Sequence, residues 1–283
     1  MIRQAKRLVA KAVTPALNIA ARSYIAGPRL TDALRVAKDI KSCGHQITIG
    51  LWDGPDDSAA DIAAGYVDAL DQLAKTDSGA YLSIKLPALD YSTELLDQTL
   101  QRSIQLGVRL HFDALAPDTA AQSWSFLEEH VGSHKNIGCT LPGRWRRSVL
   151  DADRAIELGW FVRVIKGQWA DPDPPEVDPR EGFLAVIDRL AGRARHVSVA
   201  THDVTLANQA IEILQEAGTP CDLELLFGLP KGPSLRAVAG KSITVRFYVP
   251  YGTSYIPYVL SKAVKDPRMV WWLLKDAVSG AFR

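Results

Sequence analysis

The stretch WFVRVIKGQWADPDPPEVDPREGFLAVIDRLAGRARHVSVA, residues 160–200, contains one complete strand–helix–strand unit. It begins with the apolar run Trp160–Lys166 and ends with the apolar run His196–Ala200, and both runs are rich in the β-branched residues that favour strands. Between them, Gly182–Ala194 repeats apolar residues at helical spacing. This order is typical of two parallel strands joined by a helix.

The same unit recurs along the whole chain. Strand-like runs start 22 to 36 residues apart, at His45–Trp52, Tyr81–Leu86, Val108–Asp113, Asn136–Leu141, Trp160–Lys166, His196–Ala200, Asp222–Phe227 and Thr244–Val249. Helical patterns fill most of the intervening spaces, at Ala59–Lys75, Thr93–Gln105, Ala120–His130, Val149–Leu158, Gly182–Ala194 and Leu206–Ala217. Eight alternations predict an α/β fold, the (β/α)8 TIM barrel. The last crossover, Gly228–Ser242, is short and rich in glycine and proline, so the pattern gives little support for a helix there.

The 283 residues are interpreted as a single domain with three parts. Residues 1–44 form an N-terminal helical segment, residues 45–253 form the barrel, and residues 254–283 form C-terminal helices that close the active-site face. Six cations precede the first acidic residue, Asp32, which predicts a basic amphipathic helix at the N-terminus. That helix either covers one end of the barrel, rests on a membrane surface, or serves as a transit peptide.

The composition argues against several classes of protein. Lysine plus arginine number 33 and aspartate plus glutamate 32, a near balance that argues against nucleic-acid binding. Three cysteines without a CxxC pair indicate neither a disulfide framework nor a zinc ribbon. The sequence has no apolar run long enough to span a membrane and no signal-peptide cleavage pattern. We therefore expect a cytoplasmic protein, at most peripheral to the inner membrane face.

Chemically capable residues stand at the strand ends, where barrels of this class place their active sites. Arg163 lies inside an apolar strand, so it either forms an internal salt bridge with Asp113 or faces a bound anion or electron-rich cofactor. Lys85 and Lys166 end their strands, where a lysine forms a Schiff base, holds a carboxylate or extends to the rim. His202, just past the sixth strand, is the histidine best placed for polar binding.

Signatures of metal and nucleotide binding are weak. The first strand ends in Leu-Trp-Asp where a barrel metallohydrolase carries His-x-His, and only His111-Phe-Asp113 has ligand-like spacing, so we expect no metal site. The sequence contains neither GxGxxG after a strand nor a Walker A loop. A nucleotide would therefore be held by the loops of the barrel.

Four segments on strands five to eight together resemble proline dehydrogenase, the FAD-dependent barrel enzyme that oxidises proline to pyrroline-5-carboxylate. Arg163-Val-Ile-Lys-Gly-Gln-Trp169 resembles Arg-Leu-Val-Lys-Gly-Ala-Tyr of that family, and Val199-Ala-Thr-His-Asp203 resembles Ala-Thr-His-Asn. Glu224-Leu-Leu-Phe-Gly-Leu229 resembles Gln-Met-Leu-Tyr-Gly-Met, and Arg246-Phe-Tyr-Val-Pro-Tyr-Gly252 resembles Arg-Val-Tyr-Val-Pro-Tyr-Gly. Ser83-Ile-Lys-Leu-Pro-Ala88 is a weaker match, to Ser-Val-Lys-Leu-Ser-Ala.

This resemblance implies a flavoprotein that transfers a hydride from a carbon next to nitrogen to FAD, then passes electrons to a quinone or another acceptor. It implies catalytic roles for Arg163 near the reactive edge of the flavin, Lys85 facing the substrate carboxylate, and Asp113 supporting both. The implied FAD contacts are Arg163, Ile165, Lys166, Gly167, Thr201 and His202. The implied substrate contacts are Lys85, Leu226, Tyr248, Tyr258 and Lys262.

Several positions depart from the family pattern. The family segment Tyr-Leu-Val-Arg-Arg-Leu, whose paired arginines clamp the proline carboxylate, is Tyr258-Val-Leu-Ser-Lys-Ala263 here. A single lysine lacks the bidentate fork of arginine, so we expect weaker carboxylate binding and a substrate that is proline or a related amine or imino acid. Pro142 stands where the family has a flavin-contacting glutamine, and Asp203 stands where it has asparagine.

Two other functions stay open from the residues alone. One is a Schiff-base lyase or aldolase that uses Lys85 or Lys166. The other is a catalytically degenerate barrel with a binding role. Flavin absorbance and borohydride trapping separate these alternatives from the oxidoreductase.

Overall fold

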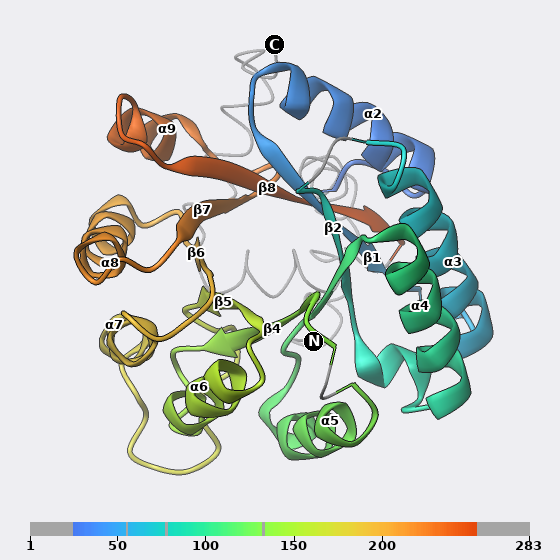
Figure 1. Ribbon diagram of the computed structural model, residues 1–283, viewed down its shortest axis with the longest axis horizontal. Helices are drawn as coiled ribbons and strands as arrows, with labels where there is room; N and C mark the ends of the chain where they lie inside the picture. The colour runs from blue at the N-terminus through green and yellow to red at the C-terminus, as the bar shows by residue number, and fades with distance from the viewer. Residues whose placement is uncertain (1–24, 55, 77–78, 132–133, 254–283) are drawn as a thin grey trace, which may run out of the picture.

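Eight parallel strands form a closed barrel in the order of the chain, with β1 beside β8 (Figure 1). The structure is a computed structural model and describes residues 25–54, 56–76, 79–131 and 134–253. The closed parallel barrel confirms the predicted (β/α)8 fold. Its strands are β1 (Gln46–Trp52), β2 (Tyr81–Ile84), β3 (Arg109–Phe112), β4 (Ile137–Pro142), β5 (Phe161–Ile165), β6 (Val197–Ala200), β7 (Cys221–Leu226) and β8 (Thr244–Gly252).

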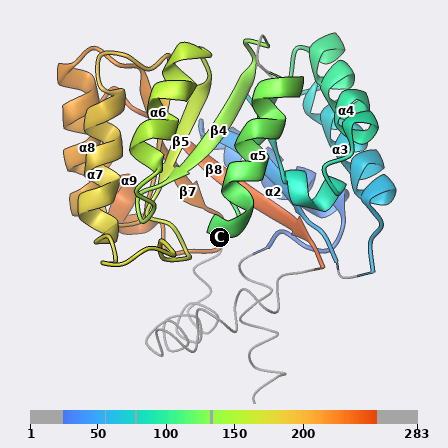
Figure 2. The ribbon, with the colours of Figure 1, turned by 90° about the horizontal axis from the view of Figure 1, so that it is seen from below.

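Helices surround the barrel and connect successive strands (Figures 1 and 2). The six crossover helices expected from the sequence are present, with ends that differ by at most four residues. The helices described are α2 (Leu30–Ser42), α3 (Ala59–Leu73), α4 (Thr93–Leu106), α5 (Pro117–His130), α6 (Ser148–Glu157), α7 (Pro179–Leu190), α8 (Val204–Glu216) and α9 (Gly232–Val238), with a 3-10 turn, η1 (Leu86–Leu89), after β2.

The short helix α9 corrects the sequence analysis, which gave little support for a helix in the last crossover. Its sequence begins Gly232-Pro233, a pair that resembles a loop. Proline is nevertheless well suited to the first turn of a helix, because its fixed φ is helical and the first N–H groups have no partner within the helix.

Polar side chains mark where several crossover helices begin. The hydroxyls of Ser58 and Ser92 accept hydrogen bonds from the backbone N–H of Asp61 and Leu95. Asp178 accepts from two N–H groups at the start of α7. Such caps satisfy N–H groups that the helix leaves unpaired, which fixes where each helix starts above the barrel rim.

The segment that precedes the first strand joins the barrel near the end of β8. The N–H of Ala26 donates to the carbonyl of Pro250 at 2.9 Å, and the N–H of Gly252 donates to the carbonyl of Gly27 at 3.0 Å. The predicted basic residues before position 25, and the predicted C-terminal helices of 254–283 with Tyr258 and Lys262, lie outside the described residues. None of the helices described combines the length and the apolar character needed to cross a membrane.

Side chains alternate along each strand between the helices and the barrel interior. Residues of one phase, such as Ile47, Leu82 and Val164, are fully buried in the apolar core beneath the helices. The other phase points into the barrel: the hydroxyl of Tyr81 on β2 lies 2.7 Å from the carboxylate of Glu224 on β7, although these strands are not neighbours. The barrel interior is therefore polar, and it ends at the site described next.

Candidate active site

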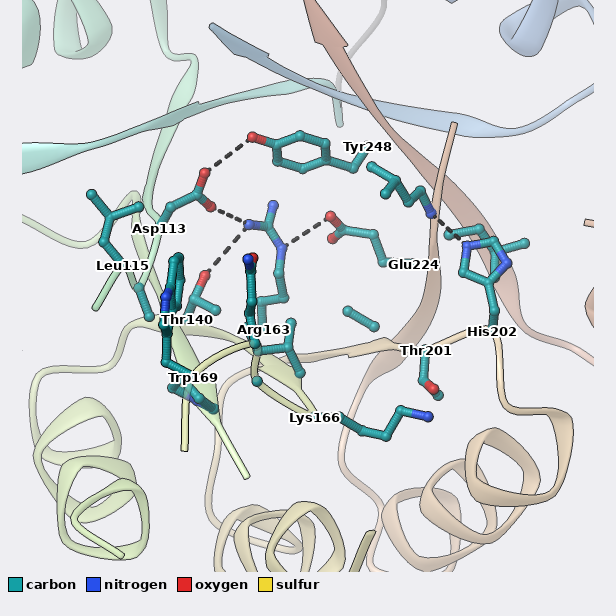
Figure 3. A pocket seen from close by; sticks show the side chains of 18 of the residues that line it. Asp113, Leu115, Thr140, Arg163, Lys166, Trp169, Thr201, His202, Glu224 and Tyr248 are labelled. Carbon is teal, nitrogen blue, oxygen red and sulfur yellow. Dashed lines mark hydrogen bonds and ion pairs between the residues drawn. The ribbon is translucent and has the colours of Figure 1, made fainter. Parts of the chain in front are cut away.

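A cavity of about 690 Å³ opens at the C-terminal ends of the strands. This volume lies in the range of small-molecule and cofactor sites, and its position is where barrels of this fold carry active sites. The cavity brings together all ten candidate residues that the structure describes, namely Lys85, Asp113, Arg163, Ile165, Lys166, Gly167, Thr201, His202, Leu226 and Tyr248. Figure 3 labels Asp113, Arg163, Lys166, Thr201, His202 and Tyr248 among them.

Arg163 lies at the floor of this cavity, on β5, with only 4% of its surface exposed. Its guanidinium is 2.6 Å from Asp113 and 2.9 Å from Glu224, and it also donates to Tyr81 at 3.3 Å. Although burial by itself would lower the pKa of Arg163, the negative groups around it, Glu224 first, raise that pKa well above its ordinary value. Arg163 is thus both an internal salt-bridge partner and a fixed cation facing the cavity.

Asp113, just after β3, holds several groups at once. Its carboxylate accepts hydrogen bonds from Ser83 at 2.7 Å and from the hydroxyl of Tyr248 at 3.0 Å, in addition to the bond from Arg163. Tyr248 enters the barrel where Gly50 lies on the neighbouring strand, because a Cβ at that glycine would collide with the tyrosine hydroxyl. Burial, followed by the charge of Asp113, raises the pKa of Tyr248 well above its ordinary value, so its hydroxyl remains a donor.

Lys85 stands on the β1 side of the cavity and is engaged by other groups. Its ammonium lies 3.2 Å from the carboxylate of Asp53 and donates to the backbone carbonyl of Leu51. Its side chain is 15% exposed. The resemblance places this lysine beside Asp113, whereas the contacts described pair it with Asp53, at the end of the first strand.

Cations also gather at the rim beyond β5 and β6. Lys166 lies 3.7 Å from the carboxylate of Asp203, and Arg180 on α7 donates to the same carboxylate. Gly167 has φ +94°, and a Cβ there would lie 3.0 Å from Pro142, so the backbone stays bare at this point of the wall. The rim is therefore positively charged and has backbone accessible to a ligand.

His202 is held by backbone groups on both of its ring nitrogens. Its Nδ1 lies 3.2 Å from the carbonyl of Pro230, and its Nε2 lies 2.9 Å from the N–H of Leu226. The N–H must donate to Nε2, so Nε2 is unprotonated and Nδ1–H donates to Pro230. Burial lowers the pKa of His202, in agreement with a neutral ring. The histidine thus positions the β7–α9 loop and the wall residue Leu226.

Buried histidines predict a loss of stability in mild acid. Burial is the first cause of the lowered pKa values of His111, His196 and His202. When the folded-state pKa of a histidine is lower, the unfolded chain binds more protons at pH values between that pKa and about 6.5. The free energy of unfolding is therefore at its full value above about pH 6.5 and decreases as the pH falls below it. We expect the free energy of unfolding, measured in urea, to drop between pH 7.5 and 5.5, by at most about 1.4 kcal/mol per histidine. A flat profile over this range would contradict the neutral assignment.

Sequence reasoning missed several side chains of the site. The most important is Glu224, an acid in the inward phase of an apolar strand that pairs directly with Arg163. The sequence signal for Glu224 is its position two residues before Leu226, because side chains two apart on a strand point to the same face. Three tryptophans, Trp52, Trp145 and Trp169, also line the cavity. Within the residues described, no group of three His, Cys, Asp or Glu side chains is arranged to hold a metal ion.

Comparisons with known proteins find similar chains and the same barrel fold. No protein-family model matches the chain. It is 23% identical over 290 residues to proline dehydrogenase 1 of Bacillus subtilis strain 168, with 96% of this chain and 95% of that protein covered. A proline utilization A structure from Bdellovibrio bacteriovorus, inactivated by N-propargylglycine, superimposes with a TM-score of 0.75 at 18% identity over 95% of this chain.

A mutant proline utilization A from Bradyrhizobium japonicum superimposes with a TM-score of 0.71 at 19% identity over 93% of this chain. The chain spans about a third of the length of these two solved chains, 34% and 32%. At these identities the structural likeness shows the barrel fold.

Proposed function

We propose that this protein uses FAD to oxidise a C–N bond of proline or of a related amine or imino acid. It is a divergent member of the proline dehydrogenase family and a proline dehydrogenase-like oxidoreductase. The observation that carries the proposal is Arg163, a buried and permanently charged guanidinium at the floor of a strand-end cavity. Electrons would leave to a quinone or another acceptor.

The cavity fits a flavin in size, wall and charge. Its volume of about 690 Å³ accommodates a planar ring with a small substrate. Ile165 and the bare backbone of Gly167 offer an apolar wall, and Lys166 with Arg180 offers a cationic rim for an anionic tail. Ile165, Lys166, Gly167 and Thr201 would hold FAD, and His202 would order the adjacent loop. When bound, FAD supplies the ring that accepts the hydride.

The chain itself contributes position and charge. Arg163 cannot turn away from the cavity floor, because Asp113 and Glu224 each hold a different part of its guanidinium. A cation fixed in this way stabilises negative charge that develops beside it, without reorganisation during the reaction. Tyr248 and Leu226 form walls that exclude water from the same place.

The contacts of the two lysines disfavour the Schiff-base alternative. A Schiff base requires a neutral amine that is free to attack a carbonyl. Lys85 is paired with Asp53 and Lys166 with Asp203, so neither amine is free to attack. We therefore assign Lys85 to the substrate-facing wall and Lys166 to the cofactor rim.

An absorbance spectrum of the purified protein, before and after addition of FAD and removal of the excess, tests the proposal. We expect flavin bands that stay with the protein and bleach when an oxidisable amine is added without oxygen. A protein that retains no flavin contradicts the proposal, and borohydride trapping of a carbonyl adduct would favour the lyase instead.

Replacing Asp203 with asparagine is expected to strengthen FAD binding. Asparagine still caps α8, but it no longer neutralises Lys166 and Arg180. Because both cations are close to half exposed, we expect a gain of about 0.5–1 kcal/mol, or up to about fivefold in Kd. FAD titration followed by fluorescence measures it. Asp153→Asn, which breaks ion pairs with Arg189 and Arg193 away from the cavity, is the matched control and should leave Kd unchanged.

A further inference from the structure

The inner part of the cavity carries an excess of negative charge. We define the inner pocket as the charged residues Asp53, Lys85, Asp113, Arg163 and Glu224, all of which line the cavity. Three carboxylates face two cations, so the formal sum is −1 for these described residues. Arg109 and Arg246 stack on the ring of Tyr81 and do not line the cavity, but both also attract the carboxylates of Asp222 and Glu224. The residues that line the inner pocket therefore include one more carboxylate than cations, although Arg163 itself remains a cation at the floor.

Both cations of the inner pocket already have carboxylate partners. Each guanidinium nitrogen of Arg163 lies close to another group: Nη1 donates to Asp113 and Nη2 to Tyr81, whereas Nε lies 2.9 Å from Glu224 as an ion pair without a hydrogen bond. Lys85 lies against Asp53 and a backbone carbonyl. Among the described residues, a carboxylate on a substrate would have to compete with these partners for either cation.

The uncharged walls are suited to a cation. The three tryptophans Trp52, Trp145 and Trp169 line the cavity, and Trp169 is 41% exposed. The ring of Tyr248 already lies against Arg163, whose guanidinium is 5.1 Å from the ring centroid. Aromatic faces attract ammonium groups through their quadrupoles, and the attraction grows when water is excluded. Aromatic walls beside more carboxylates than cations are the chemistry of a site for cationic amines.

We propose that the inner pocket selects a cationic amine without a carboxylate, and that Glu224 determines this selectivity. Lys85 pairs with Asp53, and Arg163 is shared by Asp113 and Glu224, so Glu224 is the third carboxylate beside two cations. Glu224 is 3% exposed. Glutamine has nearly the same shape as glutamate without the charge, so Glu224→Gln isolates the effect of that charge. This inference rests on the proposed function and narrows its substrate class.

Two five-membered rings of opposite charge test the selectivity. Pyrrolidine is a cation and cyclopentanecarboxylate an anion at pH 7.5, and their binding is followed by tryptophan fluorescence in the protein as purified and after FAD loading. We expect pyrrolidine to bind at least tenfold more tightly. Glu224→Gln is expected to reduce that ratio at least tenfold. Glu212→Gln, an exposed residue on α8, removes the same charge far from the pocket and should keep the wild-type ratio.

Three outcomes would overturn the inference: tighter binding of cyclopentanecarboxylate, binding of neither probe, or an unchanged ratio in folded Glu224→Gln. The wild-type ratio remains decisive if that variant fails to fold. The outcome is separable from that of the proposed function. If the protein prefers pyrrolidine but retains no flavin, only the proposed FAD-dependent oxidation is refuted. If it binds flavin but lacks this preference, only the proposed charge selectivity of the inner pocket is refuted.

Discussion

Replacing Arg163 with methionine is expected to lower the free energy of unfolding by about 3–5 kcal/mol, because it leaves the buried Glu224 and the partly buried Asp113 without their shared cation. Methionine keeps much of the side-chain volume, so the loss reports charge more than packing. Asp113 and Glu224 would then repel each other across the barrel, where Arg163 now separates them. Urea denaturation measures the stability. The absorbance spectrum after addition of FAD shows whether the variant retains the cofactor, and a redox titration measures the reduction potential of any bound flavin. We expect FAD to be lost, or to be retained with a lower reduction potential.

Arg246→Met is the matched control for this variant. Arg246 is buried to a similar degree, lies 2.9 Å from Asp222 and donates to the carbonyls of Ile47 and Gly79, but it does not line the cavity. Its replacement should destabilise the barrel to a comparable extent while FAD binding and potential are retained. An Arg163→Met protein that keeps FAD at an unchanged potential would show that the role proposed for Arg163 is wrong.

Turnover of proline by the unmodified protein is expected to be poor, and the double change Ser261→Arg with Lys262→Arg is expected to raise it by two to four decades. This expectation comes from the sequence, since both positions lie outside the described residues. A charge-assisted hydrogen bond to a carboxylate contributes roughly 1.5–3 kcal/mol. Loss of one arginine and replacement of the other by lysine would therefore remove about 3–5 kcal/mol of proline binding.

Steady-state kcat/KM with proline and an artificial electron acceptor measures this difference. Efficient proline turnover by the unmodified protein would refute the expectation. A double variant that binds FAD but gains no proline activity would place the obstacle at the flavin wall, where Pro142 provides no side-chain amide.

The fold could be predicted from sequence because its information is local. The β-branched runs and the amphipathic segments between them each report their own structure, and their alternation leaves few topologies other than the barrel. The rule that active sites lie at strand ends then selected Lys85, Asp113 and Arg163, which the cavity brings together. Helix α9 was the exception, because glycine and proline are as suited to a first helical turn as to a loop.

Only the closed barrel decided which charged groups meet. Arg163 on β5 reaches Glu224 on β7 and Asp113 after β3 because barrel closure turns alternate residues of distant strands into one interior, and no sequence spacing encodes that meeting. Lys85 likewise finds Asp53 from another strand, and both ring nitrogens of His202 are occupied by the backbone of β7 and its loop. Residue types and strand phase specify which groups enter the barrel, whereas their pairing, and with it the sign of charge presented to a ligand, follows from three-dimensional proximity.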